Sequence, residues 1–139
     1  MNAIELWDRP RAHIFLTLAE VLAPLPSRAS RSQWSVSDFV YEGRRGRQEI
    51  FEVASDEDDE LTRLYNRHER VIGSRLVAIS KSSPQVIWAT FFGYDPPDAA
   101  EPWISLHAID STFWRYETSD VATRQALIKS FKDVRLVNE

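Results

Sequence analysis

Hydrophobic and polar positions follow two periods along the chain, and each period predicts a type of element. Between residues 8 and 23 apolar side chains recur every three or four positions, which predicts a helix with one apolar face. Asp8 stands at the N-cap position, Pro10 fits a first helical turn, and Pro24 ends the pattern. The polar residues 24–33 that follow are predicted to be an extended connection.

A period of two begins after this connection and predicts a β-hairpin. Residues 34–42, WSVSDFVYE, alternate polar side chains with β-branched and aromatic ones, and residues 47–55, RQEIFEVAS, repeat the pattern. Gly43 and Gly46 bracket two arginines between these segments, which is typical of a turn. We therefore expect two antiparallel strands joined at the GRRG sequence.

A second helix is predicted from residue 61 to residue 72, where apolar side chains return to a spacing of three and four. Ser55 or Asp56 is expected to be its N-cap. The five consecutive acidic residues, 56–60, then lie near the positive end of the helix dipole, where negative charge is stabilising. One or two acidic residues suffice to stabilise the start of a helix, so the remaining acidic residues are available for a function such as binding.

The last half of the chain is predicted to consist mainly of strands. The pattern after Gly73 predicts four strands, followed by a helix that Ser119 caps and by a short final strand. The four strands are residues 75–80, 85–93, 103–110 and 113–118, the helix is residues 120–133, and the final strand is residues 134–137. The segment 85–93 is almost wholly apolar, which predicts a strand at the centre of the sheet.

This order of elements predicts one α+β domain spanning residues 1–139. The elements are a helix, two strands, a helix, four strands, a helix and a strand. We expect an antiparallel sheet of about five to six strands, with three helices packed mainly on one face. A chain of 139 residues is long enough to bury one hydrophobic core.

Composition excludes several classes of protein. Hydrophobic residues make up 43% and aromatic residues 12% of the chain, which is typical of a globular protein rather than a disordered one. No apolar run approaches the roughly 20 residues that span a bilayer, and the first residues lack the apolar core of a signal peptide. The chain has no cysteine, so disulfides and thiolate sites are excluded and a cytoplasmic location is expected. The net charge of −4 argues against nucleic-acid binding.

Motifs for catalysis or cofactor binding are not found in the sequence. The three histidines are far apart, the glycines form no phosphate-binding loop, and no nucleophile motif or convincing carboxylate pair occurs. His68 and His107 follow apolar patterns and are interpreted as core residues. We therefore expect no catalytic residue, no metal and no cofactor, and we expect that the protein is not an enzyme.

Charge is distributed in blocks that can steer a charged partner. Residues 49–60 contain seven acidic residues and no basic one, and residues 95–120 contain six acidic residues and one arginine. Residues 28–47 contain five arginines and two acidic residues. Such blocks can also be solvated surface without a binding role.

Aromatic residues concentrate in the late strands, and those at strand ends adjoin acidic loops. Most are expected in the core, but aromatic side chains ringed by acidic ones are typical of a protein-binding surface. An aromatic cleft for a small molecule is the alternative interpretation. The predicted partner-binding residues are Glu57, Asp58, Asp59, Glu60, Tyr94, Asp95, Asp98, Asp110 and Trp114.

The chain closes with the pattern STFWRYETSDVATRQALIKSFKDVRLV, residues 111–137. With this pattern, its small size, its absence of cysteine and its acidic balance, the chain resembles the small cytoplasmic immunity proteins that protect bacteria from polymorphic or contact-dependent toxins. It implies stoichiometric binding to one toxin domain. Many such toxins are basic nucleases, so it also implies an acidic surface that occupies a phosphate-binding cleft.

Two other functions stay open at this point. The first is a small-ligand-binding protein or small enzyme with an aromatic-lined cleft, which predicts a pocket of several hundred Å³. The second is a structural or adaptor subunit that forms a homodimer. The basic region between Arg28 and Arg47 could have a binding partner of its own.

Overall fold

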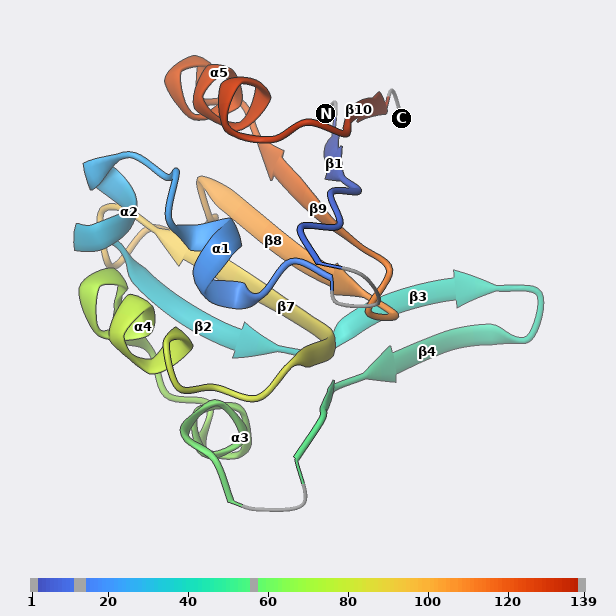
Figure 1. Ribbon diagram of the computed structural model, residues 1–139. Helices are drawn as coiled ribbons and strands as arrows, with labels where there is room; N and C mark the ends of the chain where they lie inside the picture. Colours follow the sequence, from blue (N-terminus) through green and yellow to red (C-terminus); the bar gives the residue numbers. More distant parts are fainter. Residues whose placement is uncertain (1–2, 12–14, 56–57, 138–139) are drawn as a thin grey trace.

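Figure 1 shows the computed structural model of the protein, which describes residues 3–11, 15–55 and 58–137. Within these ranges the chain forms ten strands and five helices. The first half contains β1 (Ala3–Leu6), α1 (Leu18–Leu22), α2 (Ser27–Arg31), β2 (Gln33–Ser37), β3 (Phe39–Gly43), β4 (Gly46–Ile50), β5 (Glu52–Val53) and α3 (Glu60–Arg67). The second half contains β6 (Val71–Ile72), α4 (Gly73–Ser80), β7 (Val86–Tyr94), β8 (Ile104–Ile109), β9 (Phe113–Thr118), α5 (Val121–Ser130) and β10 (Val134–Val137).

The main sheet has eight strands, and all of its pairings are antiparallel. Seven strands follow the order β10-β1-β9-β8-β7-β2-β6, and β5 pairs with β7 beside them. Strands β3 and β4 form a separate two-stranded sheet. The predicted α+β class is confirmed, whereas the predicted five to six strands and three helices are too few.

The N-terminal segment differs most from its prediction. The expected helix over residues 8–23 is wrong, because among its described residues only α1, Leu18–Leu22, is helical. The segment before it forms strand β1, which was not predicted. Asp8 does not cap a helix; its carboxylate accepts hydrogen bonds from the backbone N–H groups of Lys132 and Asp133. Thr17 and Glu20 form the capping box that starts α1 instead.

Two segments predicted to lack a helix contain one. Residues 24–33 were expected to be extended, but α2 forms one turn within them. Residues 75–80 were expected to be a strand, but they belong to helix α4. The residues that α4 buries include Gly73, Leu76 and Ser80, whose spacing is helical, and an apolar run this short does not distinguish a helix from a strand.

The predicted helix over residues 61–72 is shorter than expected. Asp59 is the N-cap of α3, and the helix ends at His68, which adopts the left-handed conformation at φ 53°. Ser55, one of the two predicted caps, lies outside α3, and the other, Asp56, lies outside the described residues. His68 is exposed rather than a core residue.

The late strands agree with their predictions. Strand β7 lies inside the sheet and pairs with β2, β5 and β8, as its apolar sequence predicted. Strands β8 and β9 form the next hairpin, and β10 is the predicted final strand. Helix α5 is capped by Asp120 rather than by Ser119, because the Asp120 carboxylate accepts hydrogen bonds from the N–H and hydroxyl groups of Thr123.

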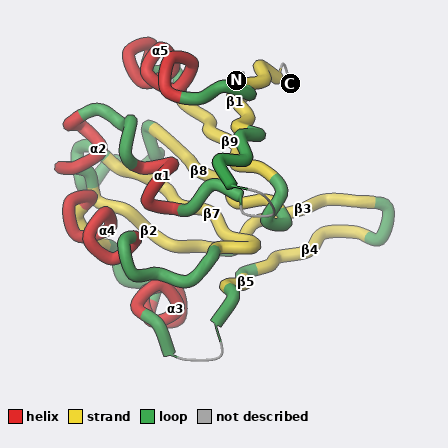
Figure 2. Tube along the Cα trace, viewed as in Figure 1, coloured by secondary structure: helices red, strands yellow, loops and turns green. Residues whose placement is uncertain are grey.

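Alternate residues of the strands divide the sheet into two faces. One face packs against helices, which overlie it in Figures 1 and 2. Its side chains form the core together with Leu18 and Val21 of α1 and Leu76 of α4. The largest fully buried members are Trp34, Tyr116, Phe91, Ile4, Leu6, Leu18, Leu61, Leu76, Ile104, Leu106 and Leu127.

Strands β3 and β4 project from the body as a hairpin that we call the arm, residues 39–50 (Figure 1). Strand β2 pairs with residues 90–94 of β7, and β5 pairs with residues 86 and 88 farther along the same strand. Residues 38–51 therefore lie between two strands, β2 and β5, that both pair with β7. The predicted hairpin is confirmed, but residues 34–42 are two strands that belong to different sheets.

Candidate functional site

The predicted acidic site begins with four consecutive acidic residues, 57–60, of which the described ones lie at the start of α3. Asp59 is the N-cap, and its carboxylate accepts hydrogen bonds from the backbone N–H of Thr62 at 2.9 Å and from the Thr62 hydroxyl at 2.7 Å. Its role is therefore structural. Glu57 lies outside the described residues.

The next two acidic side chains pair with arginines of the same protein. Glu60 contacts Arg75 of α4 at 2.8 Å, which joins α3 to α4. Oδ2 of Asp58 lies 3.7 Å from Nε of Arg63, and the side chain of Asp58 is 74% exposed. An exposed pair of this kind contributes at most about 1 kcal/mol, so Asp58 remains accessible to a charged partner.

The loop after β7 holds three more predicted residues, and two of them contact arginines. Asp95 accepts a hydrogen bond from Arg28 at 3.0 Å. The guanidinium of Arg70 lies over the ring of Tyr94, 3.9 Å from its centroid. Asp98 is exposed. The acidic loop is thus held to the body by arginines of the chain itself.

The remaining two predicted residues lie elsewhere. Asp110 is in the β8–β9 turn at φ 54°. The six residues of β8 separate it from the loop that contains Asp98, about 20 Å at roughly 3.3 Å per residue. Trp114 is 4% exposed, and its indole N–H donates to the carbonyl of Leu16. The eight predicted residues that the structure describes do not form one surface, and Trp114 belongs to the core.

A different set of side chains meets on the sheet face opposite the core, which we call the polar face. The strand registers place residues from six neighbouring strands in one cross-strand row. The row is Arg135, Glu5, Arg115, His107, Thr90 and Ser37. Within it Arg115 donates to Glu5 at 2.9 Å, although Glu5 is only 8% exposed. Polar residues thus occupy the middle of the sheet as well as its borders.

His107 is at the centre of the polar face, and both of its ring nitrogens are in contact with other side chains. Nδ1 lies 2.8 Å from the hydroxyl of Thr90. Nε2 lies 3.1 Å from the hydroxyl of Ser105 and 3.5 Å from a carboxylate oxygen of Glu117. The hydrogen bond from His107 is the main cause that lowers the pKa of Glu117 below its usual value.

The arm is fixed to this cluster at its base. The ring of Phe39 contacts the ring of Trp88 with centroids 5.4 Å apart, and it meets the ring of His107 edge-on at 5.7 Å. Farther along β3, Val40 and Tyr41 are 45% and 49% exposed. An apolar and an aromatic side chain are therefore presented to solvent on a projecting element.

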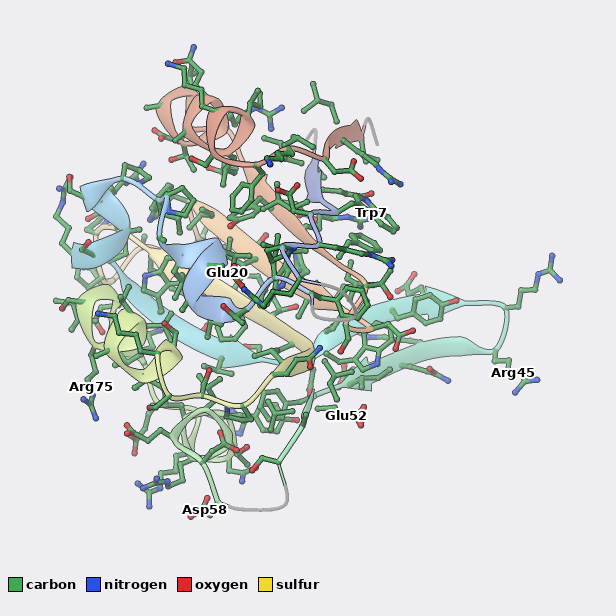
Figure 3. The ribbon with its side chains drawn as sticks, viewed as in Figure 1. Trp7, Glu20, Arg45, Glu52, Asp58 and Arg75 are labelled. Carbon is green, nitrogen blue, oxygen red and sulfur yellow. The ribbon has the colours of Figure 1, made fainter. Side chains whose placement is uncertain are left out.

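The tip of the arm is basic, whereas its base and the following segment are acidic. Arg44 and Arg45 are exposed at the turn, and Arg47 follows them (Figure 3 labels Arg45). Glu49 lies at the base of β4, and Glu52 points away from the body close to the arm (Figure 3). The arm thus combines exposed apolar side chains with charge of both signs.

A pocket of about 250 Å³ lies where the arm meets the polar face, and we call it the arm-base pocket. It is lined by Ser37, Asp38, Val40, Glu49, Thr90, Phe92 and His107. Asp38 accepts a hydrogen bond from the hydroxyl of Tyr65 at 2.5 Å. This hydrogen bond is the main cause that raises the pKa of Tyr65 to about 12.

A second hollow, of about 700 Å³, lies between the N-terminal and C-terminal segments. Its charged groups bond mainly to the protein itself. Arg135 pairs with Asp133 at 3.2 Å and covers the ring of Trp7 at 4.1 Å, and Asp8 accepts backbone hydrogen bonds. This hollow therefore offers fewer free binding groups than its size suggests.

Comparisons with protein-family models, curated protein sequences and solved structures give no match. The function of the protein must therefore be inferred from the geometry of its own structure. Among the described residues no group of three or more histidine, aspartate or glutamate side chains could hold a metal ion. None of the helices in the described ranges is long and apolar enough to cross a bilayer.

The polar face is not among the predictions above, although the sequence pattern contains a signal for it. In residues 104–109 Ser105 and His107 alternate with buried apolar residues, and in residues 113–118 Arg115 and Glu117 do the same. Strict alternation indicates a sheet with one polar face. His107 was interpreted as a core residue; its side chain is instead 14% exposed and hydrogen-bonded to polar neighbours.

Proposed function

We propose that this protein is a stoichiometric binding protein that inhibits another protein, as the cytoplasmic immunity proteins do, and that the arm is its main contact element. The observation that carries this proposal is the position of the arm between β2 and β5. Both strands pair with β7, so the sheet is complete without residues 39–50. An element whose strands lie outside the main sheet, and that exposes Val40 and Tyr41, is suited to binding.

The physical chemistry of a hairpin supports this role. Beyond its base the arm consists of two strands that pair only with each other, as far as the described residues show. An isolated two-stranded hairpin is marginally stable in water, because it buries little apolar surface. A partner that covers Val40 and Tyr41, or that pairs with a free strand edge, adds the missing contacts.

Charge near the arm supports a partner with a basic surface. Glu49 lies in the arm, Glu52 and Asp58 lie in the segment that leads from the arm to α3, and all three are exposed. Figure 3 shows Glu52 and Asp58 pointing outward on the same side of the molecule. Of the predicted acidic set only Asp58 is kept, and Glu49 and Glu52 join it because they lie in the arm or directly after it. A basic toxin domain fits this arrangement.

The experiment that tests the proposal is a pull-down from the native host with tagged protein, followed by affinity measurement on the recovered protein. In the main variant Asn-Gly replaces residues 41–48, which closes the arm with a two-residue turn between Val40 and Glu49. We expect this variant to fold and to lose partner binding. Leu136→Ser is the matched control, because Leu136 is 62% exposed on the far edge of the sheet.

Two results would contradict the proposal. The first is recovery of no partner in near-equal amount at low and moderate salt. The second is an arm-shortened variant that binds the partner as tightly as the unchanged protein. Association that slows as salt is added would further support the charged part of the interface.

A second candidate function, small-ligand binding, is favoured by the arm-base pocket. Its volume of about 250 Å³ is below the roughly 300–1,000 Å³ of sites for drug-sized ligands. His107 and Thr90 in its lining bond to each other, which leaves few groups for chemistry. A thermal-shift screen with metabolites tests this candidate, and a stabilising metabolite would support it over the binding-protein proposal.

A further inference from the structure

The arm-base pocket contains residues from both the arm and the sheet, so it lies inside the proposed interface. Val40 and Glu49 are a cross-strand pair of the arm, and both line the pocket. Asp38 lies at the joint between β2 and β3, and Phe92 comes from the polar face of β7. A group that enters this pocket therefore contacts the arm and the body at the same time.

The lining of the pocket is acidic. It contains the carboxylates of Asp38 and Glu49, and no lysine or arginine contributes to it. Tyr65 donates to Oδ1 of Asp38 at 2.5 Å, which leaves Oδ2 for another donor. Glu49 pairs with Arg47 at 3.1 Å, but both side chains are more than half exposed, and such a pair is easily exchanged for another cation.

The other polar groups of the pocket do not offset this charge. His107 and Thr90 are bonded to each other at 2.8 Å and form part of the wall. Val40 and Phe92 supply apolar and aromatic surface. Carboxylates beside an aromatic ring are complementary to a guanidinium or ammonium group, which bonds to the oxygens and is attracted to the ring face.

We infer that the arm-base pocket receives a basic side chain of the protein partner, and that arginine is the best fit. A planar guanidinium can donate to a carboxylate while it stacks on an aromatic ring, which an ammonium does less well. The volume of about 250 Å³ suits one extended side chain rather than a cofactor. This inference rests on the proposed function, because the partner supplies the arginine.

The first experiment tests the pocket without a partner. Nα-acetyl-arginine amide is titrated into the isotope-labelled protein, and Nα-acetyl-citrulline amide at matched ionic strength is the neutral control. We expect saturable NMR shifts of the Asp38, Thr90 and Phe92 amides with the arginine compound only. Equal responses to both compounds, or shifts that spare these amides, would overturn the inference.

Variants then connect the pocket to the partner. The double change Asp38→Asn with Glu49→Gln removes both charges but keeps an acceptor for Tyr65. Glu42→Gln is the control, because Glu42 is an exposed acidic residue on β3 of the arm that does not line the pocket. We expect the double variant to abolish the arginine-specific shifts and to weaken partner affinity about tenfold or more, as for loss of one member of a desolvated charge pair. The control should change neither.

The two proposals fail in different ways. If shortening the arm abolishes partner binding while the double variant binds normally, the inference about the pocket is overturned and the proposed function stands. If the arginine compound binds the pocket but the double variant keeps its partner affinity, the pocket serves a free organic cation and the inference is again overturned. If the shortened arm binds normally, the proposed function fails whatever the pocket binds.

Discussion

At the scale of single residues, His107 is held in place by its neighbours on both sides of its ring. The Glu117 carboxylate can only accept a hydrogen bond, so the proton of the neutral imidazole belongs on Nε2. Nδ1 is then an acceptor, and the hydroxyl of Thr90 donates to it. Contacts at both ring nitrogens thus fix the orientation of the His107 ring on the polar face.

The lowered pKa of Glu117 leads to a prediction about acid stability. A carboxyl group whose pKa is lower in the folded than in the unfolded chain stabilises the fold above its unfolded pKa, near 4.5, and this contribution disappears as the pH falls through the folded value. Glu117→Gln removes the contribution. We therefore expect the free energy of unfolding of the variant to decrease less than that of the unchanged protein as the pH falls below about 4.5.

Urea unfolding between neutral and acidic pH measures this difference. Glu101→Gln is the control, because Glu101 is an exposed acidic residue in the loop after β7. Parallel curves for Glu117→Gln and the unchanged protein across the acidic range would show that His107 does not stabilise the Glu117 carboxylate in the folded state.

At the scale of elements, close approach between α2 and α4 explains why one glycine is needed. Gly73 starts α4, is buried, and donates its N–H to the carbonyl of Ser32 at 2.8 Å. A Cβ atom at this position would overlap the backbone carbonyl of Ala29 in α2. The glycine thus allows the backbones of α2 and α4 to approach each other, and the two helices are in contact.

Gly73→Ala is therefore expected to be destabilising even though alanine favours helices. The new methyl group must push α2 away from α4, and overpacking of this kind costs about 1–3 kcal/mol. Ser74→Ala, one position later and exposed, is the control and should change stability little. Chemical unfolding gives both values. A Gly73→Ala variant as stable as the control would contradict the close approach of the two helices.

The elements also show how far the sequence could predict this fold. Strands β7, β8 and β9 were predictable because their apolar or alternating patterns are long, whereas α4 was not, because its apolar run is short. The start of α1 could have been found from Thr17 and Glu20, a capping box in the sequence itself. The division of residues 34–42 into two strands depends on tertiary pairing with β7, which the local pattern does not contain.

The candidate site was harder to predict than the fold. Acidic residues were chosen for their sequence density, but Asp59 caps a helix and Glu60 and Asp95 pair with arginines. The arm-base pocket combines Asp38 with Phe92, which become neighbours only when the sheet forms. Its acidic character follows from that assembly and not from a run of charge.

At the scale of the whole molecule, the arm should be the first place where a protease cuts. Loop tips that project from a domain are preferred cleavage sites, and Arg44 and Arg45 are exposed at the tip of the arm. We expect trypsin to cleave first after Arg44, Arg45 or Arg47 and to leave the rest of the protein intact. Mass spectrometry of a short digestion identifies the site.

The same digestion repeated with the bound partner extends the prediction. A partner that covers the arm should slow cleavage at the tip, while an arginine exposed elsewhere, such as Arg63, keeps its rate. First cleavage in the body, with the tip left intact, would contradict the projection of the arm. Equal rates with and without the partner would place the interface away from the arm.

The position of β1 has a consequence for synthesis of the chain. Strand β1 lies between β9 and β10, so it pairs with two strands that are synthesised much later than itself. Contacts between distant parts of a chain form slowly, and here they must wait until β9 and β10 have been translated. The nascent chain therefore carries β1 unpaired while the segments between β1 and β9 are made, and that interval is when a molecular chaperone has the most to shield.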